Sequence, residues 1–246
     1  MLRFVTAADV TPSEFSDWYI FNTWLQRKTS QRINLHIPIT FQELQQRIEA
    51  DNADMVYANP YDAAMMVRNH GFVPLARPDN LSDEIVIISK KDSPLQTFTD
   101  ISSGCRIALT DDRDVRMIGL ILIEPADCNE ENVNFIPKKN SVAVVKSVIS
   151  GEADIGFILT KSYDAFSGLV TRQLRELIRS EISVINHSLM VKPIVLEKIP
   201  NLVNILTSMH HTANGKPILD KFGINEWLPV EQEETEFMID LMETLK

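Results

Sequence analysis

Polar and aromatic side chains cluster directly after several predicted strands, where a small polar ligand could be bound. These residues are Asp9, Thr11, Tyr57, Asn59, Tyr61, Thr110, Asp111, Asp112, Arg113, Asn140 and Ser141. Each group precedes or opens a predicted helix, so backbone N–H groups and the positive end of the helix dipole point toward the same region. Ligands of open α/β sheets bind outside the carboxyl ends of the strands. We therefore expect these residues to line a ligand-binding site.

Some of these residues have an alternative, structural role. Thr11 and Asn59 stand at N-cap positions, where a side-chain oxygen bonds helix N–H groups. Asp111 and Asp112 stabilise a helix start whatever binds nearby. Tyr57 ends a predicted strand and would then belong to the core. The sequence leaves both roles open for these residues.

Known catalytic motifs are absent from the sequence. No glycine-rich phosphate loop and no nucleophile elbow occurs, and the chain has 8 glycines in all. The histidines are scattered, at His36, His70, His187, His210 and His211. A core or surface role explains each of them better than a shared site. The sequence therefore predicts no catalytic residue, no cofactor and no enzyme activity.

The two cysteines, Cys105 and Cys128, do not form a metal site by themselves, because zinc needs four ligands and no histidine lies at ligand spacing from either. We expect no bound metal. In an exported protein a disulfide between them would stabilise the fold by about 3 kcal/mol. The alternative is that both are small buried hydrophobic residues.

The composition is that of an ordinary globular chain, with 246 residues, 44% of them hydrophobic and 24% charged. A formal charge of −10 argues against nucleic acid as a partner, because phosphate binding needs clustered Lys and Arg. No window has the roughly 18 apolar residues that a membrane span needs, and residues 1–5 show no secretory signal. We expect a periplasmic protein if a signal peptide has been removed, and a cytoplasmic one otherwise.

Short apolar runs alternate with helical patterns, which is typical of βα units and a mostly parallel sheet. The predicted strands are residues 2–6, 33–37, 54–58, 84–89, 106–110 and 155–159. Helices are expected from Pro12 with Trp18, Phe21, Trp24 and Leu25 on one face, after the capping box at Thr40, after Asn59, and over residues 141–150. The sequence therefore predicts an α/β fold.

An internal similarity links residues 48–57 with residues 148–157, and a Tyr-Asp-Ala motif follows both, at Tyr61 and at Tyr163. Two related α/β lobes would produce this pattern, although chance can supply so short a match. The predicted crossings between the lobes are residues 76–83 and the stretch around 185–193. One lobe would then comprise residues 1–80 plus 188–246, and the other residues 81–187.

The chain resembles the phosphonate, phosphate and phosphite type of ABC-transporter substrate-binding protein over nearly its whole length. The resemblance is carried by the opening strand at Leu2, by Phe41-Gln42-Glu43-Leu44, by the Ala53 to Tyr61 stretch, by Ser141 to Phe157, by His187-Ser188-Leu189-Met190, and by the tail from Phe222 to Val230. It implies a periplasmic-binding-protein fold, with two Rossmann-like lobes joined by a two-crossing hinge. It further implies that the lobes close on a small ligand without performing chemistry.

The sequence departs from this family where an anion would be bound. In place of a Ser-Thr-Ser-Gly-like turn it has Thr110-Asp111-Asp112-Arg113-Asp114. A carboxylate about 5 Å from a phosphonate charge costs on the order of 3 kcal/mol at an effective dielectric near 20, and a helix N-terminus returns only about 0.3–1 kcal/mol. Repulsion therefore dominates unless Arg113, Arg116 or a bound cation compensates. The resemblance supports the fold and the binding role, but not phosphonate as the ligand.

The leading hypothesis is a monomeric, non-catalytic solute-binding protein that takes a small polar molecule, zwitterionic or cationic, and partners an ABC permease. Asp9, Asp111 and Asp112 beside Tyr61 motivate that ligand charge. One alternative is a ligand-sensing module of a signalling system. Another is an enzyme on the same scaffold, for which the sequence offers no nucleophile and base. A third is an interaction protein that docks through its acidic surface and the helix expected over residues 231–245.

Overall fold

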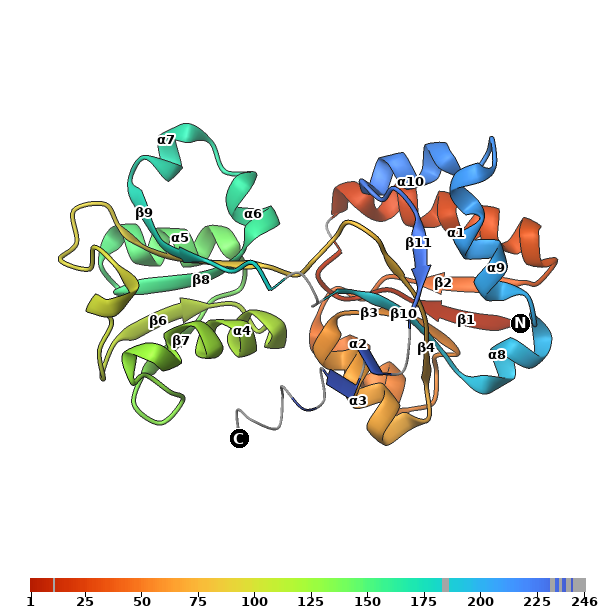
Figure 1. The fold of residues 1–246 in the computed structure, drawn as a ribbon, viewed down its shortest axis with the longest axis horizontal. Helices are drawn as coiled ribbons and strands as arrows, with labels where there is room; N and C mark the ends of the chain where they lie inside the picture. The colour runs from red at the N-terminus through yellow and green to blue at the C-terminus, as the bar shows by residue number, and fades with distance from the viewer. Residues whose placement is uncertain (11, 183–185, 231–232, 235, 238–239, 241–246) are drawn as a thin grey trace. The chain divides into compact units, whose positions relative to one another are not determined.

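The chain forms two compact units in the computed structural model (Figure 1). The structure describes all residues except 11, 183–185, 231–232, 235, 238–239 and 241–246. The first unit contains the described residues of 1–82 and of 186–240, and the second contains residues 83–182. The His187 ring packs on Tyr57 within the first unit.

The first unit is built on a six-stranded sheet with the order β11-β4-β10-β3-β1-β2. Its strands are β1 (Leu2–Val5), β2 (Ile33–His36), β3 (Met55–Ala58), β4 (Val73–Pro78), β10 (Ser188–Val191) and β11 (Trp227–Pro229). Its helices are α1 (Phe15–Thr29), α2 (Phe41–Glu49), α3 (Pro60–His70), α8 (Pro193–Lys198), α9 (Leu202–Thr207) and α10 (Lys216–Phe222), with short 3₁₀ turns at Pro12–Glu14 and Met209–His211.

The second unit is built on a five-stranded sheet with the order β7-β6-β8-β5-β9. Its strands are β5 (Ile85–Lys90), β6 (Arg106–Leu109), β7 (Asn134–Pro137), β8 (Ile155–Leu159) and β9 (Leu174–Arg179). Its helices are α4 (Arg113–Ile123), α5 (Ser141–Ser150), α6 (Thr160–Asp164) and α7 (Gly168–Thr171), with 3₁₀ turns at Phe98–Asp100 and Glu124–Ala126.

Both sheets are mixed, whereas mostly parallel sheets were expected. β1 runs parallel to β2 and β3, but β10 is antiparallel to β3 and β4. In the second unit β6 is parallel to β7 and β8, but β5 is antiparallel to β8 and β9. β5 and β10 directly follow the crossings, and a chain that passes to another unit can return in either direction. β11 is reversed as well, because it runs antiparallel to β4. β4 and β10 also occupy parts of the segments predicted as crossings.

The alternation of side chains along β1 builds a core on each face of the first sheet. Phe4 packs with Trp18 and Phe21 of α1, and Val5 packs on the opposite face with Leu44 of α2. Helices therefore cover both faces, with α1, α9 and α10 on one and α2 and α3 on the other (Figure 1). The α/β fold class is confirmed.

The helix starts agree with the predicted caps in two places. Thr40 Oγ1 accepts from Glu43 N at 3.1 Å, and Asn59 Oδ1 accepts from Asp62 N at 2.8 Å. The reciprocal bond of the Thr40 capping box differs, because the Glu43 carboxylate accepts from Ile39 N instead. None of the helices in the described ranges combines the length and apolar character that crossing a bilayer requires.

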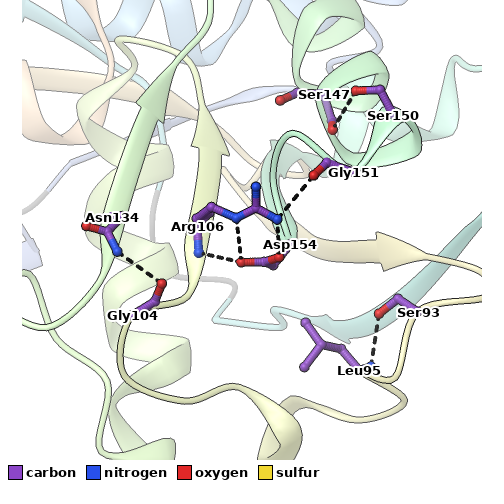
Figure 2. A network of polar contacts seen from close by, with 9 residues as sticks. All are labelled: Ser93, Leu95, Gly104, Arg106, Asn134, Ser147, Ser150, Gly151 and Asp154. Carbon is purple, nitrogen blue, oxygen red and sulfur yellow. Dashed lines mark hydrogen bonds and ion pairs between the residues drawn. The ribbon is translucent and has the colours of Figure 1, made fainter.

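The internal similarity of the sequence has a structural counterpart in each sheet. Arg106, which opens β6, donates from its guanidinium and its backbone N to the Asp154 carboxylate, just before β8 (Figure 2). Arg3 and Asp54 make the same contacts between β1 and β3. The two segments predicted to be related therefore occupy equivalent places in the two units.

Candidate functional site

In the described part of the chain, two buried polar atoms at the carboxyl edge of the first sheet lack a hydrogen-bond partner. Thr6 follows β1 and Asn59 follows β3, and these strands are neighbours through the Val5 and Val56 register. Thr6 is 0% exposed and Asn59 is 2% exposed. Within the described part of the chain neither Thr6 Oγ1 nor Asn59 Nδ2 has a hydrogen-bond partner. Because such an atom costs about 1–3 kcal/mol when unpaired, a ligand with acceptor oxygens would be stabilised here.

A carboxylate and an imidazole lie at the same edge. Asp9 Oδ1 is 3.3 Å from His187 Nε2, and both side chains are largely buried. The His187 ring stacks on Tyr57, with ring centroids 5.1 Å apart and 26° between the planes. The loop after β1, the end of β3 and the start of β10 therefore meet at one place. His187 also holds the Asp9 carboxylate in a defined position.

The three remaining first-lobe candidates differ in their surroundings. Tyr57 is 8% exposed and packs on Trp18 at 4.8 Å, so it forms the floor beneath His187 as well as part of the core. Tyr61 lies half-buried in the first turn of α3, directly after the Asn59 cap. Thr11 lies outside the described residues.

In the second unit Asp112 caps α4. Its Oδ1 accepts from Asp114 N at 3.0 Å and from Val115 N at 3.3 Å. Asp112 therefore has the structural role of an N-cap. Its carboxylate accepts hydrogen bonds from the helix N–H groups that an anionic ligand would otherwise use. Thr110 and Arg113 are half-buried beside it, and Asp111 is exposed.

Arg116 does not offset these carboxylates. Its guanidinium makes an ion pair with Glu130 and lies over the Phe135 ring, 4.3 Å from the ring centroid. The compensation that an anion would need at the α4 N-terminus must therefore come from elsewhere.

The α5 N-terminus is capped in the same way. Asn140 Oδ1 accepts from Ala143 N at 2.9 Å, and Ser141 is the first residue of the helix. The nearby Lys138 Nζ donates to Glu152 at 2.6 Å. Thr160, which opens α6 at the end of β8, has a buried Oγ1 with no partner in the described ranges. The carboxyl edge of each sheet therefore contains a buried, unsatisfied threonine hydroxyl.

Sequence reasoning missed Thr6 and His187 as site residues, and it placed Thr160 in a loop after a predicted strand without including it among the candidate ligand contacts. Thr6 and Thr160 stand at the ends of predicted strands, and this position was a usable signal. Their unsatisfied hydroxyls, however, depend on the packing around them. His187 gave no such signal, because its partners Asp9 and Tyr57 lie far away in the sequence.

The cysteines are two buried free thiols. Burial, with the nearby Asp154 carboxylate, raises the pKa of Cys105 to about 12. This thiol is therefore protonated and a poor nucleophile at neutral pH. Within the described part of the chain no group of three or more His, Cys, Asp and Glu side chains could hold a metal ion.

The sequence matches a known family over residues 4–235, described as the periplasmic substrate-binding protein of the phosphonate ABC transporter. The chain belongs to this family. Its members are non-catalytic solute-binding proteins that are normally periplasmic, so a small-molecule ligand and an ABC permease are implied as partners. No curated protein matches the chain.

Solved structures with the same fold have little sequence identity to this chain. A Prochlorococcus marinus protein in complex with methylphosphonate has a TM-score of 0.81 at 11% identity, covering 99% of this chain and 97% of its own. A Pseudomonas aeruginosa phosphonate-transporter binding component has a TM-score of 0.78 at 12% identity, covering 98% and 85%. An alkanesulfonate-binding protein from Xanthomonas axonopodis pv. citri, bound to MOPS, has a TM-score of 0.67 at 12% identity, covering 99% and 92%. These similarities establish the family's two-lobed fold.

Proposed function

We propose that this chain captures a small zwitterion for an ABC importer. The unsatisfied Thr6 hydroxyl and Asn59 amide carry the proposal. Asn59 Oδ1 is already an acceptor for Asp62 N, so its amide has only N–H groups left to offer. The first lobe would therefore bind acceptor oxygens of the ligand.

Carboxylates would bind the positively charged end of the ligand. Asp9 lies at the same edge of the first sheet, where His187 positions it. Asp111 is exposed after β6 in the second lobe. A ligand amino group near either carboxylate gains charge-assisted hydrogen bonds, whereas a dianionic ligand meets like charge.

A ligand with only an oxyanion is disfavoured by the second lobe. The side chains of Asp112 and Asn140 already occupy N–H groups at the α4 and α5 N-termini. The structural relatives were solved with methylphosphonate and with MOPS. This chain would also bind the oxygen-rich end of its ligand, but the ligand would in addition need a cationic group.

The protein would act outside the cytoplasmic membrane as a monomer. A monomer suffices because the candidate ligand-binding side chains all come from one chain. Micromolar affinity would correspond to a binding free energy of about 8 kcal/mol.

Matched ligand pairs test the ligand charge by titration calorimetry. Methylphosphonate is compared with aminomethylphosphonate, and propionate with β-alanine, so that each pair differs by an amino group. We expect the amino member of at least one pair to bind tenfold or more tightly, which is about 1.4 kcal/mol. In Asp9→Asn or Asp111→Asn this preference should fall. An unchanged preference in both variants would overturn the assignment of the carboxylates.

A further inference from the structure

A groove runs along the outer surface of α1 in the first unit. Its near wall consists of two rows of side chains spaced four residues apart, Tyr19, Thr23 and Arg27 in one and Ile20, Trp24 and Lys28 in the other. Its far wall comes from the segment before α10, with Ala213 and Asn214, and from the first turn of α10, with Pro217 and Ile218. The groove has a volume of about 590 Å³.

The groove is apolar and partly uncovered. Tyr19 is 55% exposed and Ile20 is 40% exposed, while Trp24 and Ile218 form a buried floor. The indole Nε1 of Trp24 has no hydrogen-bond partner in the described ranges. Contiguous exposed apolar side chains on a soluble protein typically mark an interaction surface.

The charge at this groove is opposite to that of the chain. Arg27 and Lys28 line it, and no Asp or Glu does. Among the described residues neither cation has an ion-pair partner, although Lys28 Nζ lies 6.0 Å from the centroid of the Trp24 ring. The chain as a whole has a net charge of −10. An acidic partner is therefore complementary to the groove.

We infer that this groove receives an acidic amphipathic helix of the ABC permease. The distance along α1 from Tyr19 to Arg27 is about 12 Å, which is roughly two helical turns. A docked helix can place apolar anchors one and two turns apart in such a groove, with its acidic residues beside Arg27 and Lys28. The inference rests on the importer role.

Two other occupants fit less well. A symmetric contact between two copies joins two grooves that both have Arg27 and Lys28 and no carboxylate, so neither cation gains a counter-ion. An anionic membrane surface attracts two cations here but repels the acidic chain as a whole. An acidic amphipathic helix supplies counter-ions to Arg27 and Lys28 and also apolar side chains for the groove.

Photo-crosslinking in cells of the native host tests the docking surface. Thr23 is replaced by p-benzoylphenylalanine, and Lys146, exposed on α5 of the second unit, is the control position. We expect a Thr23-position adduct that mass spectrometry identifies as a permease subunit. Arg27→Glu with Lys28→Glu should lower its yield at least fivefold, and Lys146→Glu should not.

The inference would be overturned if Thr23 formed adducts only with lipid or only with a second copy of this chain. It would also be overturned if the yield of permease adduct at Thr23 were no higher than at the Lys146 control position. The charge-reversed protein should stay folded but melt at a slightly lower temperature, because Arg27 and Lys28 lie in the last turn of α1, where cations are favoured. Any ligand affinity should change less than twofold, because the groove is not at the strand ends. Crosslinking does not require a known ligand. The crosslinking result therefore tests docking to the permease independently of whether the protein binds a zwitterion.

Discussion

Arg3 and Asp54 are joined by hydrogen bonds that recur between Arg106 and Asp154. Arg3 donates to Asp54 from its backbone N at 2.8 Å, from Nε at 3.0 Å and from Nη2 at 2.6 Å. The corresponding distances from Arg106 to Asp154 are 2.9, 3.1 and 2.7 Å (Figure 2). In the first unit the pair joins the turn before β3 to the start of β1. In the second unit the equivalent pair joins the turn before β8 to the start of β6.

Replacing Asp54 with Asn should destabilise the protein by about 2 kcal/mol, because charge-assisted hydrogen bonds are lost and the Arg3 guanidinium loses its counter-ion. Asp154→Asn should cost less, since its pair is more exposed. Urea unfolding measures both free energies. Asp92→Asn, at an exposed carboxylate, is the control. Equal losses at all three positions would contradict a specific role for the pairs.

The same pairs predict a loss of stability in acid. The Arg106 bonds hold the pKa of Asp154 below its usual value, against the effect of burial. Burial alone would raise the pKa of Asp54, but the bonds from Arg3 outweigh it and the pKa is lowered. The stabilisation is therefore complete above the unfolded pKa of about 3.9 and is lost as pH falls through the lowered values. Between pH 6 and 3, Asp54→Asn should lose less stability than the unmodified protein.

Thr6→Val separates a binding role from a structural one. Valine has nearly the same shape and removes a buried hydroxyl that has no partner in the described chain. The free energy of unfolding without ligand should stay level or rise. Ligand affinity should fall about tenfold by calorimetry. If stability falls and affinity does not, the hydroxyl is not a ligand donor.

His187 should act as a positioning residue. His187→Ala removes both the contact with Asp9 and the stack on Tyr57, so we expect it to weaken ligand affinity more than His187→Gln, which can still donate to Asp9. Calorimetry gives the order of the affinities. His70→Ala, at an exposed position at the end of α3, is the control and should have no effect. Equal effects of Ala and Gln would contradict positioning through Asp9.

Gly119 tests the packing of α4 on β8. A Cβ at Gly119 would lie 2.2 Å from Cδ2 of Phe157, whereas one at Gly168 would have no neighbour within 4 Å. Gly119→Ala should therefore cost about 1–3 kcal/mol through overpacking. Gly168→Ala should change stability little. Chemical denaturation compares the two, and a Gly119 variant as stable as the Gly168 variant would show that α4 can shift away from the sheet.

Local sequence predicts much of this fold. The limits of α5 and β8 agree with those predicted, because hydrophobic spacing and the Gly151 C-cap define them. The direction of β10 and β5 was not predictable, since it depends on the path of the crossings. The predicted strands did not include β4, β7, β9, β10 or β11. β9 and β11 have polar or proline residues in short segments, which weakens the strand pattern.

The candidate site was predictable only in outline. The strand-end rule places Asp9, Asn59 and Asp112 correctly at the sheet edges. Which of their atoms are already used depends on three-dimensional contacts. Asp112 Oδ1 accepts hydrogen bonds as the N-cap of α4, whereas Asn59 Nδ2 has no hydrogen-bond partner among the described residues.

The most direct test of ligand capture is a calorimetric titration of the unmodified protein with methylphosphonate and aminomethylphosphonate, and with propionate and β-alanine. The proposed site predicts that an amino compound binds at least tenfold more tightly than its partner without the amino group. Equal or tighter binding of methylphosphonate would contradict a zwitterion site and would indicate an oxyanion site despite Asp111 and Asp112. No binding by any of the four would contradict capture of a small zwitterion of this kind.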